Sequence, residues 1–72
     1  MVKDKHAHIG HIAGLIYHCL ERKGKPMSLL DVSLTIRKCP VDVLLALGWL
    51  SREGKVRIWR ELIAIMAELK KH

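Results

Sequence analysis

The sequence contains few aromatic residues and few cysteines. Its 72 residues include no phenylalanine, and the aromatic side chains are those of Tyr17, Trp49 and Trp59. Half of the residues are hydrophobic, so aliphatic side chains must fill the core. Cys19 and Cys39 form no CxxC motif and no zinc-ribbon spacing, which excludes a disulfide framework and a zinc ribbon. We interpret them as free thiols of a cytoplasmic protein.

Long apolar runs are also missing. The longest runs, 43–47 and 62–67, are far shorter than the roughly 20 residues that a membrane-spanning helix needs. The segment 1–11 is charged and rich in histidine, and it has no apolar stretch of the kind found in a secretory signal. We therefore expect no membrane partner and no targeting segment.

Catalytic and metal-binding motifs are missing as well. The sequence offers no serine or cysteine with an evident base, no paired carboxylates and no glycine-rich phosphate loop. We therefore predict that the protein is not an enzyme and has no cofactor and no small-molecule substrate. His8, His11 and His18 share one side of the first predicted helix, but no carboxylate or thiol converges on them to complete a zinc site. We interpret them as a solvated stripe that responds to pH, and we expect no metal.

Positive charge is in excess. Lys and Arg number 13 against seven Asp and Glu, which gives a formal net charge of +6 at pH 7. This sign suits a polyanion such as nucleic acid, or an anionic membrane face, although it also serves solubility alone.

Apolar residues at helical spacing predict the first two helices. The first covers about residues 8–23, and Gly24 after it suits a left-handed cap. The second begins at Ser28, which together with Asp31 resembles a capping box, and basic residues close it near residue 38. Both helices carry one clear apolar face, so we expect them to pack on a shared core.

The second half of the chain predicts a third helix followed by a strand. Pro40 suits the first helical position, where its missing N–H has no role, and Gly54 ends the helix after residue 53. Residues 55–59 alternate between polar and apolar, which predicts a strand. Residues 60–72 are rich in helix formers and have no hairpin turn signal, which favours a helix. Their apolar residues also alternate, which leaves a returning strand as the alternative.

Two stretches carry a resemblance to a known family: IGHIAGLIYHCLERKG (9–24) and LLALGWLSREGKV (44–56). They resemble small prokaryotic winged helix-turn-helix proteins, which have an IG..AG.IW-type first helix and an ALGWLAREGK-type third helix. The resemblance covers about residues 9–59. The residues that carry it are Ile9, Gly10, Ala13, Gly14, Ile16, Tyr17, Leu20, Gly24, Ala46, Leu47, Gly48, Trp49, Leu50, Arg52, Glu53, Gly54 and Lys55.

The resemblance implies a mainly α fold with a small β component, namely a winged helix-turn-helix. It implies three helices plus a short strand or wing, in which 62–69 returns to pair with 56–59, and a presumed DNA-binding role. We expect a single domain at residues 6–72 after a flexible basic N-terminus at residues 1–5.

The third predicted helix is poorly suited to reading bases. Its outward face carries Val41, Leu45, Gly48 and Trp49, and its polar residues crowd the C-terminal end. In helix-turn-helix docking, Arg, Lys, Asn or Gln near the N-terminal end meet the base edges. The second apolar face either packs within the domain or contacts another subunit. For the second case we expect a homodimer that uses Leu45, Trp49 and Trp59.

Basic residues outside that helix are better placed for phosphate. Arg37 and Lys38 end the second helix, and Lys55, Arg57 and Arg60 line the strand and the wing tip. Such contacts position a protein on DNA without reading its sequence. We predict a protein of transcription-regulator or chromatin-associated type that binds double-stranded DNA mostly through the phosphate backbone. The alternative is a protein-interaction or dimerisation module that does not bind DNA.

Overall fold

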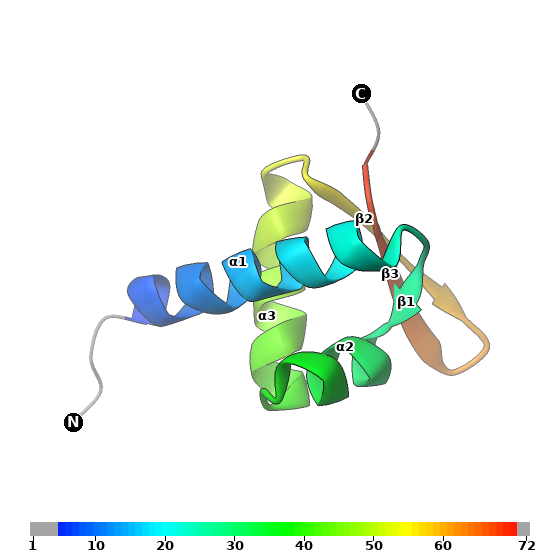
Figure 1. Cartoon of the computed structure of the whole chain (residues 1–72), viewed down its shortest axis with the longest axis horizontal. Helices are drawn as coiled ribbons and strands as arrows, with labels where there is room; N and C mark the ends of the chain where they lie inside the picture. The colour runs from blue at the N-terminus through cyan, green and yellow to red at the C-terminus, as the bar shows by residue number, and fades with distance from the viewer. Residues whose placement is uncertain (1–4, 71–72) are drawn as a thin grey trace.

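The computed structural model describes residues 5–70, which fold into three helices and a three-stranded sheet (Figure 1). The elements are α1 (Lys5–Lys23), β1 (Met27–Ser28), α2 (Leu29–Ile36), α3 (Pro40–Arg52), β2 (Val56–Glu61) and β3 (Ala64–Leu69). The predicted winged-helix order is therefore confirmed. The segment 1–5, predicted to be a flexible N-terminus, lies outside the described residues except for Lys5, the first residue of α1.

Local signals account for the ends of the first two helices. Gly24 follows α1 with a φ of +72°, the left-handed conformation that its sequence position predicts. The side chain of Ser28 caps α2 by accepting a hydrogen bond of 3.1 Å from the backbone N–H of Asp31. None of the helices within residues 5–70 is long and apolar enough to cross a membrane.

All three helices and the sheet contribute to one core. Its buried hydrophobic residues are Ile12, Ala13, Ile16, Leu20, Met27, Val32, Val43, Ala46, Leu47, Leu50, Val56 and Ala67. Figure 1 shows α1 running across α3, with α2 beside the first turns of α3 and the sheet at the far end of α1. The α1–α3 crossing is close at Gly10, where an added Cβ would lie 3.6 Å from the ring of Trp49.

The sheet has the strand order β1-β3-β2, and both pairings are antiparallel. In the central strand, Ala67 pairs with Met27 on one side and with Ile58 on the other, and it is fully buried. Because side chains alternate across a strand, the residues beside Ala67 face away from the core. Those outward residues of the β2–β3 pair include Arg57, Trp59, Met66 and Glu68.

The helix favoured for residues 60–72 is wrong, and the returning strand is what forms. A two-residue loop, Leu62 and Ile63, joins β2 to β3 although it contains none of the usual turn residues. Leu62 has a φ of +55°, and the two loop side chains are 96% and 98% exposed. Pairing of β3 with two strands at once, which local helix propensity does not register, decides its conformation.

Candidate nucleic-acid interface

The outward face of α3 is apolar along most of its length. Its exposed large hydrophobic residues are Val41, Leu44, Leu45 and Trp49. The acidic residue of the first turn, Asp42, lies with a carboxylate oxygen 3.7 Å from Nε2 of His8. Among the residue types that usually read bases, α3 contains Arg52 alone, and it lies in the last turn. The helix that would enter a major groove therefore offers bases almost no hydrogen-bonding group.

The turn between α2 and α3 holds two of the predicted phosphate-binding residues. Arg37 is exposed and adopts the left-handed conformation, with φ and ψ of +59° and +49°. The backbone N–H of Lys38 donates to the carbonyl of Ser33 at 3.1 Å, and the buried Ser33 hydroxyl donates to the carbonyl of Lys38. These bonds tie the turn to α2, so both basic residues are held at the entrance of α3.

The wing holds the other three predicted phosphate-binding residues. Lys55 is exposed just before β2, and Arg60 is exposed near the hairpin tip. Arg57 is engaged within the sheet: its Nη2 and Nε lie 2.9 and 3.0 Å from Oε2 of Glu68. Its guanidinium carbon also lies 5.1 Å from the centre of the Trp59 ring, a cation–π arrangement. Lys55 and Arg60 are therefore freer to contact phosphate than Arg57.

The five basic residues do not gather in one cluster. Arg37 and Lys38 precede the first residue of α3, whereas Lys55 follows its last turn. A helix of 13 residues is about 20 Å long, so Arg37 and Lys38 lie near one end of α3 and Lys55 near the other, while Arg60 lies farther along β2 near the hairpin tip. The five residues therefore do not form one continuous basic patch.

The three residues predicted as a dimer interface lie on two different faces. Leu45 is 56% exposed on the outward face of α3, and Trp49 is 43% exposed at the edge of that face, where its ring lies beside Gly10 of α1. Trp59 is half-buried and lies on the face of the sheet that points away from the core. A single flat contact therefore cannot use all three.

The histidines and cysteines form no metal site in the part of the chain that the structure describes. His18 pairs with Glu21, with Nδ1 and Oε1 3.5 Å apart, so it is occupied on its own helix. Cys19 and Cys39 are both free thiols. One is half-buried and the other exposed, so they differ in their access to reagents.

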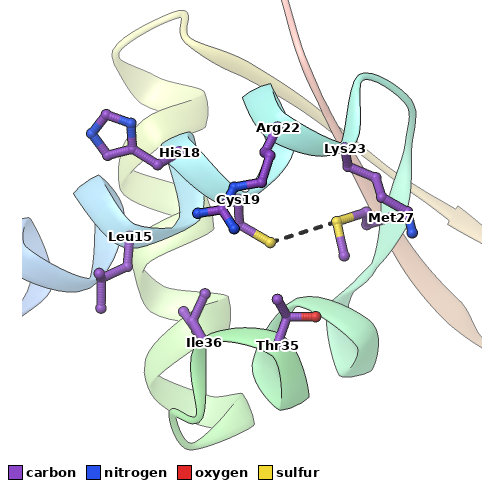
Figure 2. A pocket seen from close by; sticks show the side chains of 8 residues that line it. All are labelled: Leu15, His18, Cys19, Arg22, Lys23, Met27, Thr35 and Ile36. Carbon is purple, nitrogen blue, oxygen red and sulfur yellow. Dashed lines mark hydrogen bonds between the residues drawn. The ribbon is translucent and has the colours of Figure 1, made fainter.

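A pocket of about 400 Å³ opens between α1 and α2, next to Cys19 (Figure 2). The thiol of Cys19 donates a weak hydrogen bond of 3.7 Å to the sulfur of Met27. Burial raises the pKa of Cys19, and the opposing effect of the nearby Arg22 and Lys23 is smaller. The thiol therefore stays protonated at neutral pH, which does not suit a nucleophile.

Two pairs of exposed apolar side chains were not anticipated from the sequence. Leu30 and Leu34 are 61% and 76% exposed on α2, and Leu62 and Ile63 form the wing tip. The i, i+4 spacing of the first pair, on the side of α2 away from Val32, was a usable signal. No comparable signal marks the second pair, because its exposure follows from a hairpin that the local sequence does not announce.

The geometry described above is that of a winged helix, and the sequence matches a family described as a winged helix-turn-helix domain (DUF2582) over residues 1–66. The chain belongs to this family. The resemblance noted in the first and third helices is thereby confirmed.

Two known proteins are similar to this member of the family. An uncharacterized protein of Methanocaldococcus jannaschii is 36% identical over 63 residues, which cover 83% of this chain and 87% of that protein. A solved structure from a study of the DNA recognition and protein interaction domains of HOP2 has a TM-score of 0.76 and 22% identity. The match covers 82% of this chain and 98% of that one. Because the sequence identity is low, the likeness concerns the fold alone.

Proposed function

We propose that the protein binds double-stranded DNA mainly through the phosphate backbone, as a transcription regulator or chromatin-associated protein of low sequence specificity. The observation that carries the proposal is the separation of apolar residues, which lie on α3, from basic residues, which lie outside it. Its outward face is apolar, while Arg37 and Lys38 precede its first turn, Lys55 follows its last turn, and Arg60 is exposed near the tip of the wing. Basic residues that flank a helix contact phosphate, whereas sequence is read by polar side chains on the helix itself.

Two further facts support the proposal. The net charge of +6 favours association with a polyanion at low salt. The fold is also shared with a structure of HOP2 from work on DNA recognition, although that likeness extends to the fold alone.

A salt titration with labelled duplex DNA tests the proposal. Each phosphate neutralised contributes about −0.9 to the slope of log K against log salt, so four contacts give a slope near −3.6. Replacing Arg37 and Lys38 together with Ala should weaken binding to every sequence alike and make that slope shallower by about 1.8. The control is Lys25→Ala, which removes an exposed positive charge in the α1–β1 loop, outside the proposed contacts. A slope unchanged by the double substitution, or no binding at low salt, would reject the proposal.

We also propose that the protein is a cytoplasmic homodimer. The free state of Cys19 and Cys39 supports a reducing compartment, and the exposed apolar face of α3 supports self-association. Light scattering after size exclusion measures the mass directly against the 8.2 kDa of one chain. If Leu45 and Trp49 form the contact, Trp49→Glu should give folded monomers.

One set of observations favours a second function, a protein-interaction module that does not bind DNA. Apolar side chains are exposed on both helices of the helix-turn-helix: Leu30, Leu34, Val41, Leu44 and Leu45. An exposed apolar surface of this extent is typical of a contact with another protein. The same salt titration separates the two functions, because a docking module predicts no salt-dependent affinity for duplex DNA.

A further inference from the structure

Strand β2 has an open edge. It pairs with β3 on one side, and the sheet order places it at the margin of the sheet within residues 5–70. An unpaired edge presents backbone N–H and C=O groups that another strand can bind. β2 contains no proline to block such pairing along its six residues.

The hydrogen-bonding pattern identifies which backbone groups face that edge. The N–H of Lys70 donates to the C=O of Lys55 at 2.9 Å, in line with the register that pairs Val56 with Leu69. In an antiparallel ladder, residues alternate between those bonded to the neighbouring strand and those that are not. Arg57, Trp59 and Glu61 therefore bond towards β3. The backbone groups of Val56, Ile58 and Arg60 point to the open edge.

On the outward face of β2, a positive residue, an apolar residue and a negative residue follow one another. Two such strands in antiparallel orientation place opposite charges beside each other. Arg57, Trp59 and Glu61 follow one another on that face of β2. If a second copy pairs antiparallel with Trp59 opposite its own counterpart, each Arg57 lies opposite a Glu61. These are pairs without direct backbone bonds between them, in which side chains approach most closely.

From this edge and this charge order, we propose that two copies of the chain associate by antiparallel pairing of β2 with β2, with Trp59 on the two-fold axis. The inference rests on the proposed homodimer and names a strand edge as its contact, in place of the outward face of α3; its tests measure dimers and not DNA binding. The two sheets then become one sheet of six strands. A two-fold axis requires a self-complementary surface, which this charge order supplies.

The proposed pairing extends a charge row that already exists within one chain. The guanidinium of Arg57 binds Oε2 of Glu68 through two of its nitrogens, and it has further N–H donors. Glu61 of the second copy occupies the opposite side of the same guanidinium, which gives the row Glu68, Arg57, Glu61. Between two such rows, Trp59 and Met66 of both copies form an apolar row.

The same register gives a role to the exposed wing tip. Leu62 and Ile63 are 96% and 98% exposed in a single chain, which is unusual for two adjacent aliphatic residues. With Trp59 on the axis, they lie alongside Val56 and Lys55 of the second copy. The tip then contacts the start of the neighbouring strand instead of water.

A charge exchange tests the proposed register. Arg57→Glu alone places two carboxylates opposite each other, and Glu61→Arg alone places two guanidinium groups opposite each other. Each variant should dimerise about tenfold more weakly or worse, measured by sedimentation velocity. An equimolar mixture of the two should restore dimers, because each mixed pair again has opposite charges.

Glu53→Arg, which makes the same charge change as Glu61→Arg but at the end of α3, is the control and should dimerise like the parent. A mixture that stays monomeric would overturn the register, as would a parent chain that is monomeric at its highest soluble concentration.

A second test acts on the backbone and does not depend on the Arg57–Glu68 pair. Arg60→Pro removes an N–H that points to the open edge and is not used by β3, so the single chain should keep its circular dichroism spectrum. Arg60→Ala removes the same side chain and keeps the N–H. The proline variant should be monomeric and the alanine variant dimeric. Equal dimerisation of the two would reject the edge contact, while loss of dimers only in Trp49→Glu would assign the contact to α3.

Discussion

The helix-turn-helix half and the wing of this molecule are stabilised by different kinds of contact. In α3, four buried residues at helical spacing, Val43, Ala46, Leu47 and Leu50, contact the core within 13 consecutive residues. The β2–β3 hairpin contributes two fully or nearly fully buried residues, Val56 and Ala67, and both depend on pairing across the sheet. The helical half is thus specified by its local pattern, and the wing by contacts between segments far apart in the chain.

This difference predicts where a substitution acts. A buried side chain of α3 packs against the core, so its removal leaves a cavity. Ala67 of β3 faces the core and is fully buried, so its side chain has little room to grow. The side chains of Leu62 and Ile63 at the wing tip are almost fully exposed in the single chain, so the effects of substituting them should come from backbone conformation.

The largest expected effect lies in the helical half. Leu47→Ala removes a fully buried side chain and should lower the free energy of unfolding by about 2–5 kcal/mol, measured by urea denaturation. Leu45→Ala, two residues away on the same helix, removes a side chain that is 56% exposed and should cost less than about 1 kcal/mol. Equal losses at low protein concentration would mean that α3 is buried on both faces, and the contrast drawn above would fail.

The next effect probes the central strand of the wing. Ala67 is fully buried between β1 and β2, so Ala67→Leu should lower the free energy of unfolding by about 1–3 kcal/mol through overpacking. Ala64→Leu adds the same atoms at the hairpin end of β3, where the residue is half-buried, and should cost less. An Ala67→Leu protein as stable as the parent would show that the sheet can shift to admit the larger side chain, and the expected difference between Ala67 and Ala64 would fail.

The same contrast explains how much could be predicted from the sequence. The cap at Ser28, the left-handed Gly24, the proline at the first position of α3 and the helical apolar spacing are local signals, and they predicted all three helices. The strand β3 was missed as the favoured state because its composition suits a helix and because Leu62 and Ile63 carry no turn signal. Its pairing with β1, some 40 residues earlier in the chain, leaves no mark on the local pattern.

The candidate interface could be predicted in part for the same reason. The apolar outward face of α3 follows from its periodicity, and it appeared where expected. The engagement of Arg57 by Glu68 could not be anticipated, because it requires the register of a hairpin that was not favoured. The separation of Trp59 from Trp49 likewise requires knowledge of which face of the sheet Trp59 occupies.

A smaller effect, of opposite sign, should appear at the wing tip. Leu62 has a φ of +55°, which costs an L-residue with a side chain about 1–2 kcal/mol and costs glycine almost nothing. Leu62→Gly should therefore raise the free energy of unfolding. The gain should be only roughly 0.5–1 kcal/mol, because the greater freedom of glycine in the unfolded chain offsets part of the relieved strain. Ile63→Gly, at the adjacent loop position without a positive φ, should lower it. The opposite pattern in thermal or urea unfolding would show that the tip is held by side-chain contacts and not by its backbone conformation.

The smallest effect concerns the ion pair on the outward face of the wing. Glu68→Gln removes the partner of Arg57, whose side chain is 59% exposed, so solvent screening limits the loss to a few tenths of a kcal/mol. A double-mutant cycle with Arg57→Gln, run at low and high salt, isolates the coupling between the two residues. The coupling should shrink as salt rises, because exposed charges are screened. A coupling that stays the same at high salt would mean that the two hydrogen bonds and the Trp59 contact, and not the charges, hold the arginine against the sheet, and the wing would then be more rigid on this face than its exposure suggests.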